Sequence, residues 1–459
     1  MTGRAASGLS GLGRYVGVNV LVLAYAWLLH RVYRFQIAPA FDYLGQRYRE
    51  PDIIAYAVAI LLTVALGLCL PWRVRRPSEF VVWLLYLMVA APTMLVPHYA
   101  DVIEVEQAFE LTFVAGAAFI VLVFGIRPRP WKVRIIVPPH VVWFVITATT
   151  VCVYGYMFMT TGLTLRFVAL GDVQDLRFAY RDELQVSGGM LAYLILLQSN
   201  VINPIIVARG IYAKRFGMVL VGALGQFLIF SVTGYKLVLL SIPAFVGLAL
   251  AHRWQGRLRG AALLGGVMGA AGLALAIDWL QGSLYYAQIF INRLLLTPGT
   301  LSAAHILVFD DRPKAMWGHS FLAGIVDYPY SVSPAFLVGT IFSGSAETSA
   351  NANFIADGYA NLGYPGIFIE TVILIVILRL LDATGRDLPI AVTSIILLVP
   401  TLATVNSGAF TSLLTGGYLA AMILMATVPR TGWGLSRSRF RRSEACEADE
   451  ITRREANTT

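Results

Sequence analysis

The chain alternates long apolar runs with short polar segments over most of its length. A helix that crosses a bilayer needs roughly 20 mostly apolar residues, because lipid cannot satisfy an open backbone. Twelve runs qualify, at approximately 14–33, 52–70, 79–96, 109–126, 138–158, 188–207, 216–233, 236–251, 260–279, 364–380, 388–406 and 410–428. The pattern therefore predicts an all-α polytopic integral membrane protein with about 12 transmembrane helices.

Composition argues against a soluble globular protein. Hydrophobic residues make up 58% of the 459, charged residues 13%, and the mean hydropathy is +0.70. The first run ends at Arg31 without a small-residue cleavage site, so we expect it to be retained as a helix. Cys69 and Cys152 fall within apolar runs and Cys446 in a polar tail, which argues against a disulfide framework or a CxxC metal site.

Positive charge is concentrated in the segments on one side of the predicted spans. The formal net charge is +9. If successive spans cross in alternating directions, the two termini and every second loop lie on the same side, and 24 of the 35 Lys and Arg residues lie in or near these segments. The other 11 lie elsewhere. This is the positive-inside pattern, so both termini are predicted to be cytoplasmic. The basic residues orient helices, and we expect a multi-pass protein of a cytoplasmic membrane with no nucleic-acid partner.

The predicted organisation is a single polytopic membrane domain, residues 1–431, followed by a charged cytoplasmic tail, 432–459, that we expect to be disordered. Three outside segments keep Lys or Arg against the charge rule, at 31–51, 159–187 and 280–363. The third is the longest loop, and loops of that length are usually functional. We expect it to hold short interfacial or re-entrant helices near 283–295 and 333–342.

The strongest local signal is the segment ETSANANFIADGYANLGYPGIF, residues 347–368. Its amides and carboxylates lie just before and at the mouth of the predicted span 364–380: Glu347, Asn351, Asn353, Asp357 and Asn361. Polar groups at such a place are costly unless they are used. The structural alternative is that Ser349 or Asn351 caps a helix, while Gly358, Gly363 and Gly366 let helices approach closely. The density of amides and carboxylates exceeds what capping needs.

Four cations on the outside are candidates for binding a diphosphate. Arg177 and Arg181 stand four residues apart and would share one helix face, and a guanidinium binds phosphate oxygens in bidentate fashion. Lys236 and Arg293 are isolated cations on the side that normally avoids positive charge. The alternatives are salt bridges between the arginines and neighbouring acids, and snorkelling of the isolated cations to the interface.

Three carboxylates and one imidazole could take a proton from an attacking hydroxyl: Glu347, Asp357, Asp182 and His319. His319 also fits an interfacial histidine that only finds a hydrogen bond. The acidic pair Asp310–Asp311 has no further ligands at metal spacing and resembles a turn, so we predict no metal. The sequence contains no P-loop, HExxH, GxSxG or CxxC motif, which weakens ATP-driven transport and hydrolysis by those routes.

Several of these segments together resemble the bacterial oligosaccharide repeat-unit polymerases, also called Wzy-type or O-antigen polymerases. The resemblance covers most of the chain. It is carried by the twelve-span layout, by DVQDLRFAYRDE before a span with Asn200, Asn203 and Pro204, by TGYKLVLLS and by INRLLLTPG. Above all it is carried by ETSANANFIADGYANLGYPGI.

The resemblance implies a glycosyltransferase-C-like enzyme of the bacterial inner membrane that uses no cofactor. It would polymerise undecaprenyl-diphosphate-linked repeat units into a surface polysaccharide on the periplasmic face, where the loops 159–187 and 280–363 would lie. The four outside cations would hold the donor diphosphate, and one of the four candidate bases would activate the acceptor. Four further residues would bind the acceptor sugar: Asn351, Asn353, Tyr359 and Asn361. The partners would be the lipid-linked donor and acceptor, the bilayer, a flippase and a chain-length regulator.

Three other interpretations stay open, of which one is a non-enzymatic role such as a scaffold for envelope assembly. A glycosyltransferase like the O-antigen ligases would use the same donor and a different acceptor, with nearly the same layout. A transporter or lipid-linked oligosaccharide flippase would line a central path with charges from several spans. The mid-span positions of this chain are nearly free of charge, which favours the polymerase over the flippase.

Overall fold

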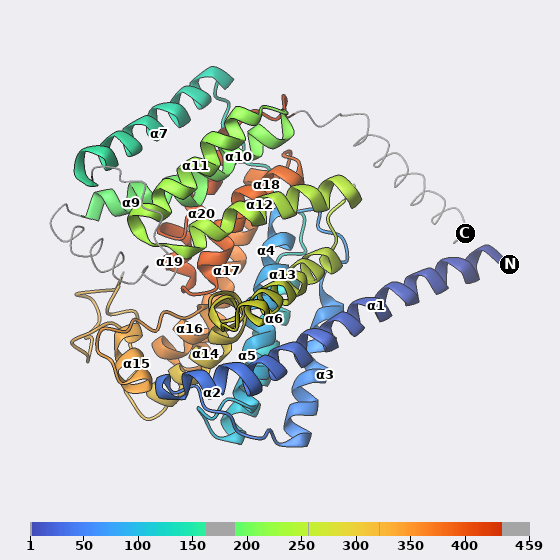
Figure 1. The fold of residues 1–459 in the computed structure, drawn as a ribbon, viewed down its shortest axis with the longest axis vertical. Coiled ribbons are helices and arrows are strands. Elements are labelled where there is room, and N and C mark those ends of the chain that lie inside the picture. Colours follow the sequence, from blue (N-terminus) through green and yellow to red (C-terminus); the bar gives the residue numbers. More distant parts are fainter. Residues whose placement is uncertain (1, 162–188, 256, 321, 434–459) are drawn as a thin grey trace.

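The computed structural model describes residues 2–161, 189–255, 257–320 and 322–433, and the regular elements in these ranges are all helices (Figure 1). The label η marks π- or 3₁₀-helical segments. The first half contains α1 (Thr2–Val32), η1 (Tyr33–Ile37), α2 (Ala38–Phe41), η2 (Asp42–Leu44), α3 (Ile53–Cys69), α4 (Pro77–Leu85), η3 (Tyr86–Ala90), α5 (Ala91–Leu95), η4 (Val96–His98), α6 (Val105–Gly125), α7 (Pro139–Thr161), α9 (Gly189–Leu197), η5 (Gln198–Ile202) and α10 (Asn203–Tyr212). The second half contains α11 (Phe216–Thr233), α12 (Lys236–Gln255), α13 (Gly260–Gln281), η6 (Ala287–Leu296), α14 (Thr297–Phe309), α15 (Pro334–Ser343), α16 (Phe354–Leu362), α17 (Tyr364–Gly385), α18 (Ile390–Thr404), α19 (Ala409–Leu414) and α20 (Tyr418–Thr427).

Eight helical stretches among the described residues are long and apolar enough to cross a membrane. They are Pro77–His98, Val105–Gly125, Pro139–Thr160, Ala192–Tyr212, Phe216–Thr233, Lys236–Arg253, Gly260–Gln281 and Ala409–Thr427. Each coincides with one of the twelve expected spans, which makes the chain an all-α multi-pass membrane protein. The four other expected spans fall on α1, α3, α17 and α18, and their crossing of the bilayer stays a prediction.

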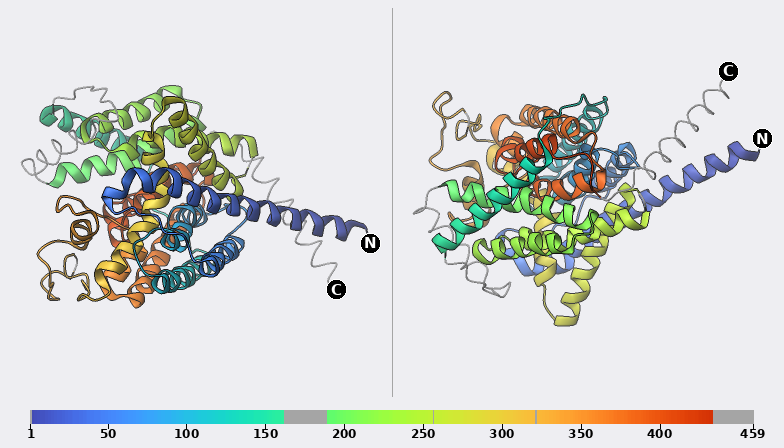
Figure 2. Two further views of the ribbon diagram at one scale, coloured as in Figure 1. Left: turned by 60° about the horizontal axis from the view of Figure 1, so that its bottom comes forward. Right: turned by 90° about the horizontal axis from the view of Figure 1, so that it is seen from above.

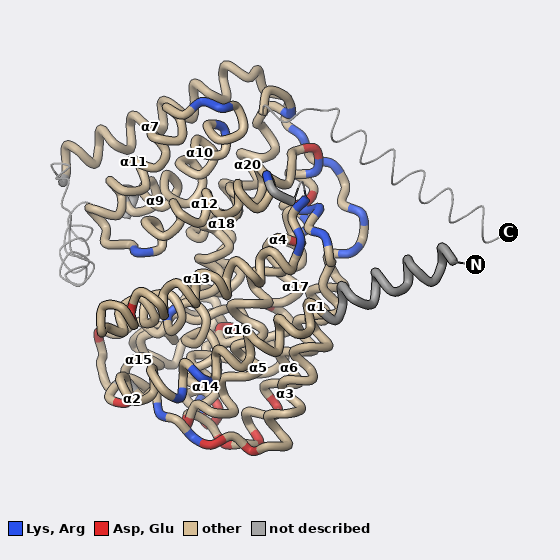
Figure 3. The backbone as a smooth tube through the Cα atoms, turned by 45° about the vertical axis from the view of Figure 1, so that its right-hand side comes forward, with Lys and Arg blue, Asp and Glu red and all other residues tan. Residues whose placement is uncertain are grey.

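The basic segments that were predicted to share one side lie together at one end of the molecule, which we call the basic end (Figure 3). An isolated bridge joins Arg73 to Arg259, so the segments around 71–76 and 257–259 are neighbours. Lys132 pairs with Asp387 at 2.5 Å, which joins the segments 126–137 and 382–387. Three hydrogen bonds bring further basic segments to the same end. Arg76 donates to the Ile126 carbonyl, Arg430 to the Thr384 carbonyl, and Arg209 to the Gly432 carbonyl.

The segments at 42–52, 97–108 and 310–364 meet at the other end, which we call the opposite end. Tyr48 and Ala100 form an isolated bridge. The Gln107 amide donates to Asp310 at 2.8 Å, and the Tyr364 hydroxyl donates to Glu110 at 2.8 Å. These three segments, all assigned to the outside by alternation, therefore gather away from the basic loops.

Acidic neighbours explain most of the positive charge in the segment 31–51. Arg34 pairs with Glu50 at 2.6 Å, and Arg47 with Asp42 at 3.1 Å. Arg49 lies 3.7 Å from Asp101. These arginines lie at the opposite end against the charge rule, and acidic neighbours there balance their charge. They are therefore not candidates for a ligand-binding site.

The helical stretch Pro77–His98 is the centre of the bundle, and its whole apolar window is buried. It packs against α3, α14, α17 and α18. Figures 1 and 2 show α7 and α9–α12 as a second group of helices beside this bundle. That group has a small apolar cluster of its own, built on Val153, Met157, Ile195, Ile229 and Val238. The described residues therefore form one main core and one satellite core.

The expected loop 280–363 is largely helical. The helices expected near 283–295 and 333–342 correspond to η6 and α15, but α14 was not expected. Nearly every residue of α14 is buried, and it approaches the central helix closely at Gly299, where an added Cβ would lie 2.3 Å from the Pro92 carbonyl oxygen. The TPG sequence that starts α14 resembles a turn, but Pro is well tolerated in the first turn of a helix.

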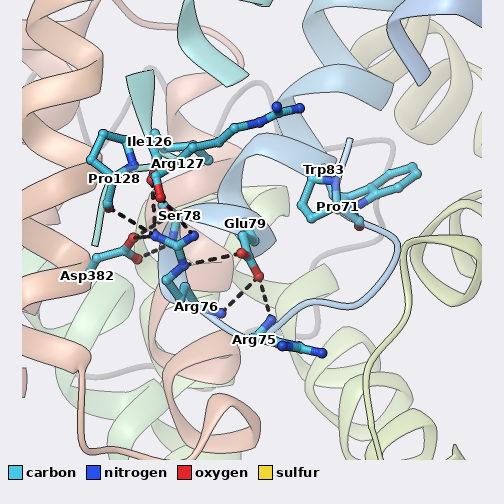
Figure 4. Close-up of polar contacts among 10 residues, drawn as sticks. All are labelled: Pro71, Arg75, Arg76, Ser78, Glu79, Trp83, Ile126, Arg127, Pro128 and Asp382. Atoms are coloured by element: carbon cyan, nitrogen blue, oxygen red, sulfur yellow. Dashed lines mark hydrogen bonds and ion pairs between the residues drawn. The ribbon is translucent and has the colours of Figure 1, made fainter. Parts of the chain in front are cut away.

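A cluster of polar contacts ties three segments together at the basic end (Figure 4). The buried Asp382 carboxylate accepts hydrogen bonds from the Ser78 N–H at 2.8 Å and the Ser78 hydroxyl at 2.7 Å. Arg76 lies 3.7 Å from Asp382, and its side chain also donates to the carbonyls of Ile126 and Pro128. Arg76 thereby joins the start of α4, the end of α6 and the end of α17.

Candidate functional site

The motif of residues 347–368 folds as a helix, a sharp turn and a second helix. Asn353 caps α16, with its side-chain oxygen accepting from the N–H groups of Ile355 and Ala356. Its amide nitrogen donates to the Pro298 carbonyl at 3.2 Å and to the Ser302 hydroxyl at 3.1 Å. The expectation that Ser349 or Asn351 is the cap was wrong, and the Asn353 amide is engaged inside the protein, anchoring α16 on α14.

Two glycines bring α16 and α17 into close contact, as the structural alternative predicted. A Cβ added at Gly366 would lie 2.0 Å from the Gly358 carbonyl oxygen. The turn between the helices is at Gly363, whose φ of 66° and ψ of −151° suit only glycine. This close approach brings residues of α16 against the first turns of α17.

The consequence is a pair of carboxyl groups, Asp357 from α16 and Glu370 from α17, whose side chains hydrogen-bond to each other. Glu370 is fully buried and accepts from the Ala409 N–H at 2.7 Å and from the Trp317 indole N–H at 3.3 Å. Asp357 lies against Gly408, where an added Cβ would be 2.5 Å from a carboxylate oxygen. Two carboxyl groups in direct contact hold one proton between them, because both cannot ionise at that distance without a large cost.

The segment 314–320 closes over this pair. Asn361 accepts from the Trp317 backbone N–H at 2.7 Å and donates to the Asp357 carbonyl at 2.8 Å. Met316 and Trp317 both have left-handed backbones, with φ of 47° and 53°. Non-glycine residues rarely adopt this conformation, and such strain is typical of functional sites. The turn puts the Trp317 indole on Glu370 and fixes the pair.

Burial raises the pKa of the Asp357 carboxyl above its usual range, and the hydrogen bond from Glu370 partly opposes this shift. A general base works best when its pKa lies near the operating pH. Of the three candidate bases among the described residues, Glu347, Asp357 and His319, Asp357 is the one that the fold surrounds with positioning contacts. The arrangement suits transfer of a proton from a hydroxyl group.

Tyr359, on the same helix, belongs to a neighbouring polar cluster. Its hydroxyl donates to Asp310 at 2.8 Å, and the Lys314 ammonium lies 4.5 Å from the centre of its ring. Asp310 also accepts from Gln107. Asp357 and Tyr359 stand two residues apart on α16, about 200° around the helix, so this cluster and the carboxyl pair lie on different sides of it.

The other candidate bases lie in simpler surroundings. Glu347 and Asn351 are exposed in the segment between α15 and α16. His319 is partly buried against Tyr328, with ring centres 5.5 Å apart, and burial lowers its pKa. Its Nδ1 is buried and has no hydrogen-bond partner among the described residues. Asp182 lies outside the described residues.

Among the predicted cations, Lys236 begins α12 and its ammonium lies 5.4 Å from the centre of the Tyr285 ring. Tyr285 lies two residues before the start of η6, which carries the exposed residue Arg293. The fold thus brings Lys236 next to the segment that carries Arg293. Arg177 and Arg181 lie outside the described residues.

Glu370 was not among the predicted site residues. The signal was present, because an ionisable residue inside an apolar run is costly unless it has a partner. The motif at 347–368 carries the dense polar signal, whereas Glu370 is a single acid inside the apolar run 364–380.

Comparisons of the chain with protein-family models, with curated proteins and with solved structures found no match.

Proposed function

We propose that this protein is a membrane glycosyltransferase that polymerises undecaprenyl-diphosphate-linked repeat units at the periplasmic face of the bacterial inner membrane. The observation that carries the proposal is the buried Asp357–Glu370 pair at the end away from the basic loops. Under the positive-inside rule the basic end is cytoplasmic. The proposed enzyme crosses the membrane twelve times and has both termini in the cytoplasm.

In the proposed reaction the acceptor hydroxyl attacks the anomeric carbon of the donor glycan. The new glycosidic bond forms as the bond from that carbon to the diphosphate oxygen breaks, and the hydroxyl proton passes to the Asp357 carboxylate. Undecaprenyl diphosphate leaves with the bonding electron pair. Lys236 and Arg293, with Arg177 and Arg181 from the segment 159–187, stabilise the negative charge on that leaving group.

The proposed acceptor site lies beside Asp357. Asn351 is exposed and available for sugar hydroxyls, and Tyr359 lies on α16, the helix that also carries Asp357. Asn353 and Asn361 use their amides inside the protein, and we assign them the role of positioning α16 and the segment 314–320. The proposed partners, a flippase and a chain-length regulator, would supply the acceptor and set the polymer length.

The test is a deletion strain complemented with the gene, followed by electrophoresis of its surface glycan. We expect chains limited to one repeat in the deletion strain and a full ladder after complementation. Normal chain lengths in the deletion strain would rule out a polymerase. Loss of all glycan transfer to the surface acceptor would instead favour the ligase.

Replacing Lys236 or Arg293 by Ala is expected to reduce elongation about tenfold or more, because a charged hydrogen bond to phosphate is worth roughly 1.5–3 kcal/mol. Ladder length and polymer yield in the complemented strain measure the effect. The control is Arg31→Ala, which removes an exposed cation that stacks on Phe35, 4.2 Å from the ring centre, outside the proposed site. Equal ladders from all three variants would overturn the diphosphate assignment.

Glu370 is assigned as a positioning residue, and its variants should change the pH profile of elongation. Glu370→Gln keeps a donor for Asp357 and should retain most activity. Glu370→Ala removes the hydrogen bond that lowers the pKa of Asp357, so the pKa rises and the base needs a higher pH to be ionised. Elongation rates in isolated membranes at a series of pH values test this. An Ala variant with the wild-type profile would contradict the assignment.

A further inference from the structure

A groove of about 340 Å³ opens on the second helical group, between α7, α10 and α11. Its wall is almost entirely apolar. Six residues define its course: Trp143, Thr147, Val151, Ile206, Gly217 and Val221. Trp143 and Val151 are eight residues apart on α7, so the groove extends roughly 12 Å along the helix. Because α7, α10 and α11 belong to candidate spans, the medium around the groove is hydrocarbon.

The end of the groove at Trp143 lies at the basic end of the molecule. The Arg209 guanidinium stacks 5.2 Å from the centre of the Trp143 ring and 5.3 Å from that of Trp433. Trp143 therefore lines the groove on one side and contacts a cation on the other. An amphipathic tryptophan with a neighbouring cation is typical of the level of the lipid head groups.

Two more cations lie at this mouth. The segment from Arg209 to Gly217 also carries Lys214 and Arg215, both exposed, and contains no Asp or Glu. Lys214 has a φ of 57° at the end of α10, a position where glycine would avoid strain of about 1 kcal/mol. The sequence has a lysine at this position, so three cations, Arg209, Lys214 and Arg215, lie beside an apolar groove.

Gly217 leaves the groove open. A Cβ added at this position would meet no atom within 4 Å, and the residue is exposed. A larger side chain would therefore extend into the groove without a clash. An apolar groove that continues into a cationic mouth has the two chemistries of an anionic phospholipid, an acyl chain and a negatively charged head group.

We propose that this groove binds an anionic phospholipid of the leaflet at the basic end, with one acyl chain along α7 and the phosphate at Arg209, Lys214 and Arg215. The three cations favour an anionic lipid, because a zwitterionic head group has no net charge and would gain little binding energy from them. The site is distinct from the Asp357–Glu370 pair and does not depend on the proposed polymerase activity.

The test is native mass spectrometry of the full-length protein, delipidated in detergent and mixed with equal amounts of phosphatidylglycerol and phosphatidylcholine. We expect the wild type to retain phosphatidylglycerol in preference. Gly217→Phe should abolish this retention, because the ring occupies the groove. The double variant Lys214→Gln, Arg215→Gln should weaken it by about fivefold for each cation removed. Arg209→Gln should act in the same direction.

Two controls match these variants. Gly265 on α13 is exposed and also has open space around its Cβ position, so Gly265→Phe adds the same ring elsewhere. Arg257→Gln removes an exposed cation from the same end of the molecule. Both should bind phosphatidylglycerol like the wild type. Equal retention of the two lipids by the wild type, or full retention by Gly217→Phe, would overturn the proposal. An elongation assay on the same variants separates this result from the polymerase proposal.

Discussion

Asp357→Asn is expected to stop elongation and leave chains of one repeat, while the protein stays at its normal level in the membrane. The change keeps the size of the side chain and its hydrogen bond to Glu370, but it removes the group that takes the acceptor proton. General-base catalysis contributes about 100- to 10,000-fold in rate. Electrophoresis of the surface glycan and immunoblotting of membranes measure the two quantities.

The matched control is Glu347→Gln, which removes an exposed carboxylate of the same motif. It should give a full ladder. The wild-type rate should also fall as the pH is lowered through the pKa of Asp357, which burial raises, so the loss should begin above the range near 3.9 in which an exposed Asp titrates. A full ladder from Asp357→Asn would refute the assignment of the base and leave Asp182, Glu347 or His319 in its place.

Arg76→Ala is expected to destabilise the fold by about 3–5 kcal/mol. Asp382 is 1% exposed, and removing its cationic partner leaves a buried charge whose remaining hydrogen bonds, among the described residues, come from Ser78. The substitution also leaves the carbonyls of Ile126 and Pro128 without the Arg76 donor. A lower thermal midpoint in detergent and a lower level in membranes would report the loss.

The neighbouring Arg75 provides the control for this prediction. Arg75 is an exposed residue, and the hydrogen bond that its backbone N–H donates to Glu79 at 2.6 Å is preserved in Arg75→Ala. A surface change of this kind usually alters stability by less than about 0.5 kcal/mol. If Arg76→Ala unfolds at the temperature of Arg75→Ala, the cluster at the basic end does not hold the helices together.

The sequence by itself determined that the chain contains apolar helices long enough to span a membrane, and which of the described polar segments share an end. Both properties are local, because an apolar run of sufficient length must be helical in lipid and the charge beside it sets its direction. The contacts of Arg73 with Arg259 and of Lys132 with Asp387 agree with that pattern. The closely packed glycines Gly358 and Gly366 could also be recognised from the motif.

Only the tertiary structure decided which polar residues meet. Glu370 is one acid in an apolar run, and its role depends on a turn at Gly363 that brings it to Asp357 and on Trp317, 53 residues away in sequence. The burial of α14 likewise depends on its contact with α5, which no local pattern specifies. Hydrophobic periodicity reports the environment of a segment, whereas a site is made by side chains from segments far apart in the chain, and packing alone selects those neighbours.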